Sequence, residues 1–296
     1  MTIRTVLAAL SLSLALAGAA RAGDGDGAPP PDPGFEEDLV AFPEAEGDIG
    51  LDFSLRAWAR IWGPTLRGRM EHEVAGSGRD VSFAKDLGID TEEPAGWFGL
   101  DLTLSPRVTL RAEMVLDHVE GRDPLHDEVA FKGATLLEGT DVDTRIELYA
   151  GNVAFEFDVF ERKRIRLAIP VGVHYLSARM RLRETVSRRK VDHTEDGFIP
   201  FAGFVVEANP WRGLLLGGGI RLGFVNLKDR DERGSRDHST YVDVWGGVGW
   251  RFGDAIAIEV GWRVMRTDID FEGTGVDDRV AEVALSGPWA GLSLAF

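Results

Sequence analysis

Residues 165–175 read IRLAIPVGVHY, and this stretch decides the fold class. Every second residue is apolar or aromatic, from Ile165 through Val171 to Tyr175, while the positions between them hold small or polar residues such as Arg166 and His174. Successive side chains of a β-strand point to opposite faces, so this period of two predicts a strand with one apolar and one polar face. A helix would instead repeat its apolar residues three and four positions apart.

The same alternation recurs from residue 51 to the end of the chain. It is found at Leu51, Phe53, Leu55, Ala57, Ala59 and Ile61, at Phe98, Leu100, Leu102 and Leu104, at Val108, Leu110, Ala112, Met114 and Leu116, at Leu214, Leu216, Ile220, Leu222 and Phe224, at Val242, Val244, Val248, Trp250 and Phe252, at Ile256, Ile258, Val260, Trp262 and Val264, and at Leu292, Leu294 and Phe296. Two further segments are less regular, because residues 144–159 change phase near Gly151 and residues 197–207 are apolar on both faces. The pattern predicts ten strands. Eight and twelve are the alternatives, since residues 65–74 are read as an extension of the first strand and residues 128–137 could add a hairpin.

The connections alternate between tight and long. Tight ones are expected at Ser105-Pro106, Glu161-Arg162, Asn209-Pro210 and Gly253-Asp254, and long polar ones near residues 72–95, 121–143, 184–196, 229–238 and 272–279. This asymmetry predicts an all-β fold, an antiparallel up-and-down transmembrane β-barrel with short periplasmic turns and long extracellular loops. A soluble periplasmic lipocalin-like barrel with inward apolar faces is the alternative. Strands of nine or more residues and aromatic residues near the turns (Phe160, Trp211, Phe252 and Phe296) favour the membrane barrel.

The N-terminal residues predict secretion. Arg4 precedes an apolar run over residues 6–20, followed by Ala20-Arg21-Ala22, which is typical of a signal-peptidase site. We therefore expect a signal peptide over residues 1–22. Residues 23–47 are acidic and rich in Pro and Gly, a composition too polar to bury a core, and are expected to form a disordered periplasmic lead-in. Residues 48–296 would form the barrel.

The last strand carries a resemblance to a known class of proteins. Leu292, Leu294 and the terminal Phe296 alternate with Gly291, Ser293 and Ala295. This ending resembles the closing strand of bacterial outer-membrane β-barrel proteins. The resemblance implies a place in the outer membrane of a Gram-negative cell, with membrane lipid and the outer-membrane assembly machinery as partners and the terminal strand as the signal that this machinery reads. It implies no particular activity.

Composition excludes several classes of function. The chain has no Cys, which excludes disulfides, Cys-linked lipid and Cys-based metal or nucleophile chemistry. Its formal charge of −16 argues against nucleic acid as a partner. The sequence contains no phosphate-binding loop, zinc-protease helix or α/β-hydrolase elbow, and its acidic runs lack the spacing of a calcium loop. No cofactor and no metal are therefore expected, and the barrel is expected to be a monomer.

If the apolar faces meet lipid, the opposite faces line the lumen. These faces carry charges of both signs, at Arg56, Arg60, Asp101, Arg111, Glu113, Arg166, His174, Arg221, Asp243, Arg251, Glu259 and Arg263. An unpaired charge in a low dielectric is costly, so these residues are expected to pair and to fill the lumen. A narrow channel or small-ligand barrel is the second hypothesis, although barrels of about eight strands have filled interiors.

Three Asp-His neighbours raise the possibility of catalysis at the extracellular rim. They are Asp117-His118, Asp192-His193 and Asp237-His238, and they invite comparison with omptin proteases and lipid A deacylases. Adjacent residues of a strand point to opposite faces, so none of these neighbours can act as a pair within one strand. The leading hypothesis is thus a non-enzymatic barrel with a structural or surface-exposed role, and a rim hydrolase is the third.

Overall fold

The computed structural model describes residues 54–74, 77–83, 87, 89, 93–125, 129–131, 134–162, 164–186, 190–228, 236–253, 255–272 and 278–296. The expected signal peptide and the acidic lead-in lie outside the described residues. The described part of the chain contains no helix long and apolar enough to cross a membrane.

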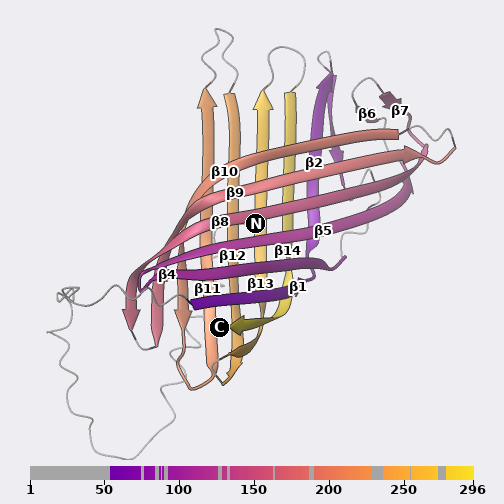
Figure 1. Cartoon of the computed structure of the whole chain (residues 1–296). Coiled ribbons are helices and arrows are strands. Elements are labelled where there is room, and N and C mark those ends of the chain that lie inside the picture. The colour runs from indigo at the N-terminus through magenta and orange to yellow at the C-terminus, as the bar shows by residue number, and fades with distance from the viewer. Residues whose placement is uncertain are drawn as a thin grey trace, which may run out of the picture. The chain divides into compact units, whose positions relative to one another are not determined.

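The described residues form a closed antiparallel barrel of ten strands, as the alternation predicts (Figure 1). Its elements are β1 (Ser54–Trp62), β2 (Thr65–Val74), β3 (Ser77–Ser82), β4 (Ala95–Ser105), β5 (Val108–Pro124), β6 (Val129–Phe131), β7 (Ala134–Leu136), β8 (Asp141–Arg162), β9 (Ile165–Glu184), β10 (Lys190–Ala208), β11 (Leu214–Lys228), β12 (Arg236–Phe252), β13 (Ile256–Glu272) and β14 (Asp278–Ala295). The barrel closes because β1 pairs with β4 on one edge and with β14 on the other.

Strand pairing shows what is formed by residues 65–74 and 128–137, the two segments that left the number of strands open. β14 pairs with β1 through residues 289–295 and with β2 through residues 279–286, so β2 continues β1 after a bend at Gly63-Pro64. The two elements together are one barrel strand, which confirms the extension. Residues 128–137 do supply a hairpin, since β6 and β7 form a separate two-stranded sheet. β3 pairs with β2 only within the described residues, outside the ten-stranded ring.

Short connections join β4 to β5, β8 to β9, β10 to β11, and β12 to β13, the four places where tight turns are expected. The turn expected at Glu161-Arg162 lies slightly later, because these residues still belong to β8 and pair with β9. The chain ends of the barrel lie at this same end, which we call the turn end, because the backbones of Leu55 and Phe296 are hydrogen-bonded to each other at 2.8 and 3.3 Å. The other end differs from expectation. β9 runs to Glu184 and β10 starts at Lys190, so most of the polar stretch predicted as a loop over residues 184–196 is strand.

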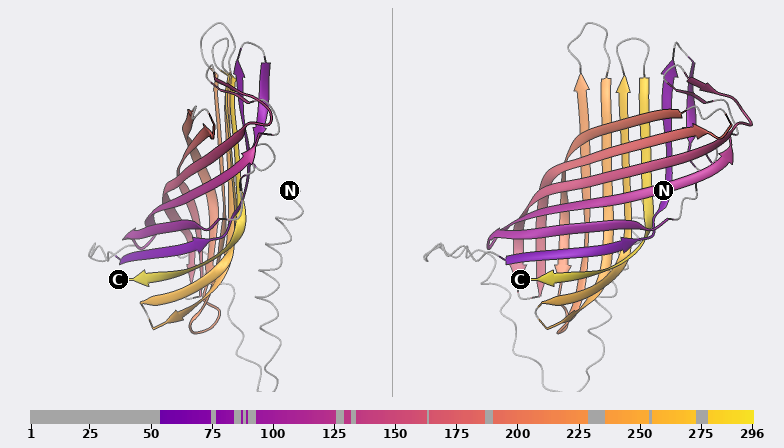
Figure 2. Two further views of the ribbon diagram at one scale, coloured as in Figure 1. Left: turned by 90° about the vertical axis from the view of Figure 1, so that its right-hand side faces the viewer. Right: turned by 45° about the vertical axis from the view of Figure 1, so that its right-hand side comes forward.

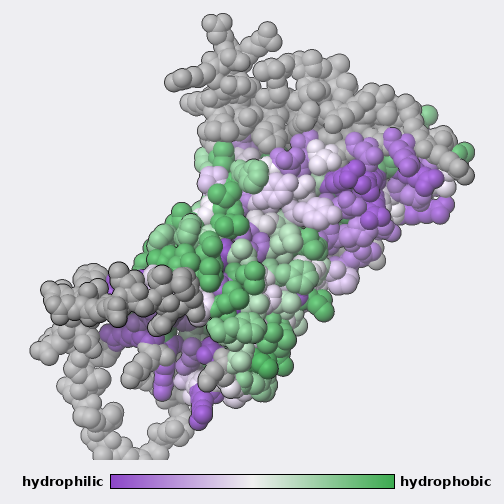
Figure 3. Space-filling view, in the orientation of Figure 1, coloured by the Kyte–Doolittle hydropathy of each residue, from purple (hydrophilic) through white to green (hydrophobic). Residues whose placement is uncertain are grey.

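The strands invert their polarity along their length. On the outward face of β8, Tyr149, Val153 and Phe155 are exposed apolar residues, whereas the inward positions of that level hold polar side chains such as Asn152. Toward the far end the outward residues become charged, as at Glu147, and the inward ones become apolar. Figure 3 shows the same change, with hydrophobic side chains in a band over the lower part and hydrophilic ones over the far end of β8–β10.

We call the exposed apolar belt the outer band. It is formed by outward residues of every barrel strand, among them Leu55, Phe98, Leu100, Met114, Val153, Phe155, Val171, Val173, Phe204, Leu222, Val248, Ile258 and Leu292. These apolar faces point away from the barrel axis, opposite to the lipocalin-like alternative. Beyond the band the strands continue as an extension with an apolar interior that includes Val119, Ile146, Met180, Ile269 and Val283.

The strands of the extension form two groups, which separate from each other between β10 and β11. β10 and β11 pair only from Phe201↔Gly223 to Ala208↔Leu216, although both strands continue past Phe201 and Gly223. Figures 1 and 2 show the consequence, with β8–β10 running at an angle to the upright β11–β14. Pro200 lies where the two strands part, consistent with the lack of an N–H that could extend the ladder.

Candidate functional site

The centre of the lumen holds a cluster of four charged side chains from four strands of the barrel. Glu113 on β5, Arg221 on β11, Asp243 on β12 and Arg263 on β13 are each buried at 3% side-chain exposure or less. Arg263 contacts Glu113 at 3.0 Å and Asp243 at 2.8 Å, and Arg221 bridges the same two carboxylates. Two positive and two negative charges therefore neutralise one another across the barrel. We call these four residues the central cluster.

Neutral polar residues extend the central cluster toward the extension. Asn152 donates to Glu113 at 2.7 Å, and Tyr241 donates to Asp243 at 3.1 Å. His174 stacks on the Tyr241 ring at 3.9 Å between centroids and lies 2.8 Å from the Asn152 side-chain oxygen. His174 has no exposed surface, so it is a packed lumen residue here and not an accessible base.

A second group, the lower cluster, lies nearer the turn end. Arg111 contacts Asp101 at 2.7 Å and Glu156 at 2.7 Å. Its members are three arginines and four carboxylates, namely Arg56, Arg111, Arg166, Asp101, Glu156, Asp158 and Glu207. Every carboxylate of the group lies within 3.2 Å of an arginine nitrogen. Such pairing offsets part of the cost of taking charges out of water.

Arg60 forms a third site with aromatic walls. It contacts Glu259 at 2.6 Å, and its guanidinium carbon lies 4.3 to 4.4 Å from the ring centroids of Trp58, Trp97 and Trp289. Arg263 also lies over the Trp97 ring, 4.1 Å from its centroid. Cation–π contacts of this kind stabilise desolvated arginines, each by roughly 1–2 kcal/mol.

Inward-facing glycines make room for these indoles. A Cβ at Gly99 would overlap the Trp58 ring, and one at Gly247 would lie 2.6 Å from Trp289. Gly217 is different, because an added Cβ would meet no atom within 4 Å. The glycine-rich run of β11 and β12 thus accommodates lumen aromatics at some positions and leaves unfilled space at another.

Eleven of the twelve lumen residues expected from the sequence point inward and contact other lumen residues in these three groups. The exception is Arg251, which lies on the same face of β12 as Asp243 but is exposed near the turn end, and its side chain has no hydrogen-bond or ion-pair partner among the described residues. Sequence reasoning missed Asn152, Glu156, Asp158, Glu207 and Tyr241. Four of these five lie in the two segments whose alternation was irregular, where the face of each residue could not be assigned.

The Asp-His neighbours do not form a catalytic pair among the described side chains. Asp117 points inward, whereas His118 faces outward and contacts Glu120 at 2.9 Å. His238 is exposed and packs edge-on against Phe224, and Asp192 pairs with Arg181 at 3.1 Å. The side chains of His193 and Asp237 lie outside the described part. No group of three or more potential metal ligands occurs within the described ranges.

Asp117 is a separate feature of the extension. It lies one residue beyond Leu116, where the outer band ends on β5, and it is only 5% exposed. Leu148 is its cross-strand neighbour, and Val115 and Val119 flank it on the inward face. Burial raises the pKa of the Asp117 carboxyl to about 6, and the nearby charge of Glu93 contributes to the rise.

No protein-family model and no curated protein matches the sequence. Solved structures match the fold. The outer membrane protease OmpT from Escherichia coli is similar over 81% of this chain and 97% of its own, with a TM-score of 0.52 and 14% identity. The translocator domain of the autotransporter NalP from Neisseria meningitidis (TM-score 0.37, 11% identity, 82% and 88% coverage) and the outer membrane protein OprG from Pseudomonas aeruginosa (0.37, 8%, 83% and 96%) are more distant. The fold is that of the outer-membrane β-barrel proteins, in which an outward apolar belt contacts lipid.

Proposed function

We propose that this chain is a closed, non-conducting outer-membrane barrel whose extension acts at the cell surface. The central cluster carries the proposal. Arg221, Asp243 and Arg263 have at most 1% of their surface exposed, although they lie inside the barrel at the level of the outer band. A water-filled pore at this level would leave these side chains accessible to solvent. Their burial supports a lumen that is filled by side chains throughout its width.

The polarity of the extension supports a role outside the membrane. Its outward face carries ion pairs such as Arg145 with Glu147 at 3.0 Å and Arg266 with Glu282 at 2.8 Å, which suit contact with water. Its interior is an apolar core of the kind found in soluble β-proteins. The extension therefore folds by hydrophobic burial beyond the lipid and offers a rigid surface for contact with other molecules. The turn end and the N-terminal segment would face the periplasm.

The other partners follow from the same arrangement. Membrane lipid would cover the outer band, and the assembly machinery would read Leu292, Leu294 and Phe296, whose side chains point outward. A monomer suffices, because the ten strands close without a second chain.

A channel and a rim hydrolase are the alternatives to this proposal. The likeness to OmpT concerns the fold, and the two chains share 14% identity. No described Asp and His side chains lie together at the rim, so the likeness alone does not extend to proteolysis. A peptide-cleavage assay with the purified barrel would revive the hydrolase if activity depended on His118, His193 or His238.

The absence of Cys allows the surface role to be tested directly. Val186, between β9 and β10, is 86% exposed, and Ala255 lies in the β12–β13 turn at the opposite end. A membrane-impermeant maleimide should label Val186→Cys on intact cells, and Ala255→Cys only after the outer membrane is permeabilised. Labelling of both variants or of neither on intact cells would contradict the proposed orientation or location.

A further inference from the structure

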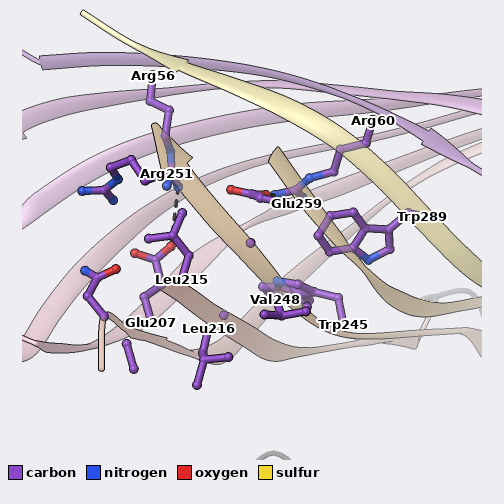
Figure 4. A pocket seen from close by; sticks show the side chains of 15 residues that line it. Arg56, Arg60, Glu207, Leu215, Leu216, Trp245, Val248, Arg251, Glu259 and Trp289 are labelled. Atoms are coloured by element: carbon purple, nitrogen blue, oxygen red, sulfur yellow. Dashed lines mark hydrogen bonds and ion pairs between the residues drawn. The ribbon is translucent and has the colours of Figure 1, made fainter. Parts of the chain in front are cut away.

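The turn end of the lumen contains a small pocket, and Figure 4 shows the side chains that line it. It has a volume of about 90 Å³ and is lined by residues that include Arg56, Arg60, Glu207, Arg251, Glu259 and Trp289. The pocket exists because inward positions of β11 and β12 are glycines. Gly217, Gly247 and Gly249 line it, and an added Cβ at Gly217 would meet no atom within 4 Å.

The carboxylates that line this pocket are paired with arginines, whereas one of its arginines has no partner among the described residues. Glu259 is engaged by Arg60 at 2.6 Å, and Glu207 is engaged by Arg166 at 3.2 Å and by Arg56 at 3.5 Å. Arg251 also lines the pocket, but its guanidinium has no hydrogen-bond or ion-pair partner among the described residues. The Nε of Arg60 is buried and likewise has no hydrogen-bond partner there. Arg251 thus brings an unpaired guanidinium to the cavity, and Arg60, which also lines it, is paired with Glu259 alone among the described residues.

The apolar lining of the pocket and the arginine-lined depression beside it both favour the binding of an anion. Trp289 and Leu215 supply apolar surface, which strengthens an ionic hydrogen bond by excluding water. A second, open depression of about 450 Å³ adjoins the pocket through Glu207 and Asn209, and Arg162, Arg164 and Arg166 line it. Arginines around an opening attract anions and raise their local concentration.

We propose that this pocket binds one small oxyanion, a phosphate or a carboxylate, with Arg251 and Arg60 as the donors. Arginine presents its N–H groups in a planar fork that matches two oxygens of either anion. A pocket of about 90 Å³ admits an inorganic phosphate or the carboxylate end of a longer molecule. Glu207 and Glu259 limit the site to one anion. Arg166 and Arg60 already pair with these two carboxylates, so they cannot also neutralise a second anion, which the carboxylates would repel.

Two substitutions test the site from different directions. Arg251→Gln removes the free guanidinium, and Gly217→Val fills the cavity without changing any charge. Arg212→Gln is the matched control, because Arg212 is an exposed arginine of the β10–β11 turn at the same end and does not line the pocket.

The measurement is calorimetric titration of inorganic phosphate, and separately of acetate, into the folded full-length chain in non-ionic detergent at constant ionic strength. We expect saturable binding of one anion, weakened at least tenfold by Arg251→Gln and by Gly217→Val and within twofold of wild type in Arg212→Gln. Saturation by phosphate alone assigns the phosphate class, and saturation by acetate assigns the carboxylate class. The proposal is overturned if neither anion saturates, or if Arg212→Gln weakens binding as much as Arg251→Gln. The closed lumen is not at stake, because the pocket lies on the turn side of the central cluster.

Discussion

Arg263 donates two hydrogen bonds to the carboxylate of Asp243, from Nε at 2.8 Å and from Nη2 at 2.9 Å. Neither side chain has any exposed surface. This bidentate pair joins β13 to β12 inside the barrel, and Arg263 continues through Nη2 to Glu113 on β5. The pair therefore couples neighbouring strands and also spans the lumen. Its geometry explains how charged residues can fill a barrel instead of opening it.

Loss of one member of this pair should be costly. Asp243→Asn leaves Arg221 and Arg263 with Glu113 as their one carboxylate, and an uncompensated buried charge costs about 3–5 kcal/mol. We expect the free energy of unfolding in urea, measured in detergent micelles, to fall by that amount. Arg266→Gln is the control, because it removes two exposed ion pairs, with Asp268 and Glu282, each worth about 0.2–1 kcal/mol. Equal losses in the two variants would refute the central cluster as a buried network.

The glycines of the lumen should differ sharply in their tolerance of a methyl group. Gly99→Ala places a Cβ in the Trp58 ring and should lower stability by about 1–3 kcal/mol through overpacking. Gly217→Ala meets no neighbour and should be neutral or gain up to about 1 kcal/mol from the reduced backbone entropy of the unfolded chain. Urea unfolding of the two variants side by side checks this difference, and equal effects would contradict the packing around Trp58.

Asp117 should make the extension more stable in mild acid. The pKa of its carboxyl is about 6 in the folded chain, above the ordinary value of 3.8, so the folded state binds more protons between these two pH values. The contribution of Asp117 to the free energy of unfolding should therefore rise as the pH falls from about 6 toward 4. Comparison with a variant that lacks this carboxyl separates its contribution from those of other titrating groups. Asp117→Asn should be more stable than wild type by about 2–3 kcal/mol at pH 7.5, and this advantage should disappear near pH 4.

The control for this prediction is Glu120→Gln, an exposed position on the outward face of the same strand. Its stability should follow the wild type at both pH values. An advantage of Asp117→Asn that persists unchanged at pH 4 would show that the substitution acts through packing and not through the charge of the carboxylate.

The C-terminal residue offers a way to separate the backbone from the side chain. The Phe296 backbone closes the barrel through two hydrogen bonds with Leu55, while its ring is 76% exposed. Deletion of Phe296 removes both contributions, and Phe296→Ala removes the ring alone. If assembly depends on recognition of the ring, both variants should reduce the compact, heat-modifiable band from membrane fractions to a similar extent. A defect confined to the deletion would assign the effect to strand closure.

The period of two was sufficient to predict the strands and the tight turns, because outward residues of a membrane barrel alternate strictly with inward ones. It could not reveal what surrounds each face. The phase change near Gly151 is no break in β8, since the strand continues while the environment of its outward face changes from apolar at Val153 to charged at Glu147. Polar stretches such as residues 184–196 look like loops in the sequence because several of their charged residues, among them Lys190, Asp192 and Asp196, lie on the exposed outward face of a strand extension.

The same alternation predicted most of the charged residues of the lumen, because along each strand they alternate with the apolar residues of the outward face. Glu156 and Glu207 were missed because they lie in the two irregular segments. Arg251 has the correct parity, but near the end of β12 its guanidinium forms no ion pair with the described carboxylates, although it lines the same pocket as Glu207. The pairing of specific charges across the lumen depends on barrel closure, which no local pattern encodes.

The closed lumen is tested most directly by conductance. The purified barrel, reconstituted in a planar lipid bilayer, should produce no discrete current steps in the wild type, because the central cluster and the side chains around it fill the lumen. Stable, unitary conductance by the wild-type protein would contradict the account and establish the chain as a channel.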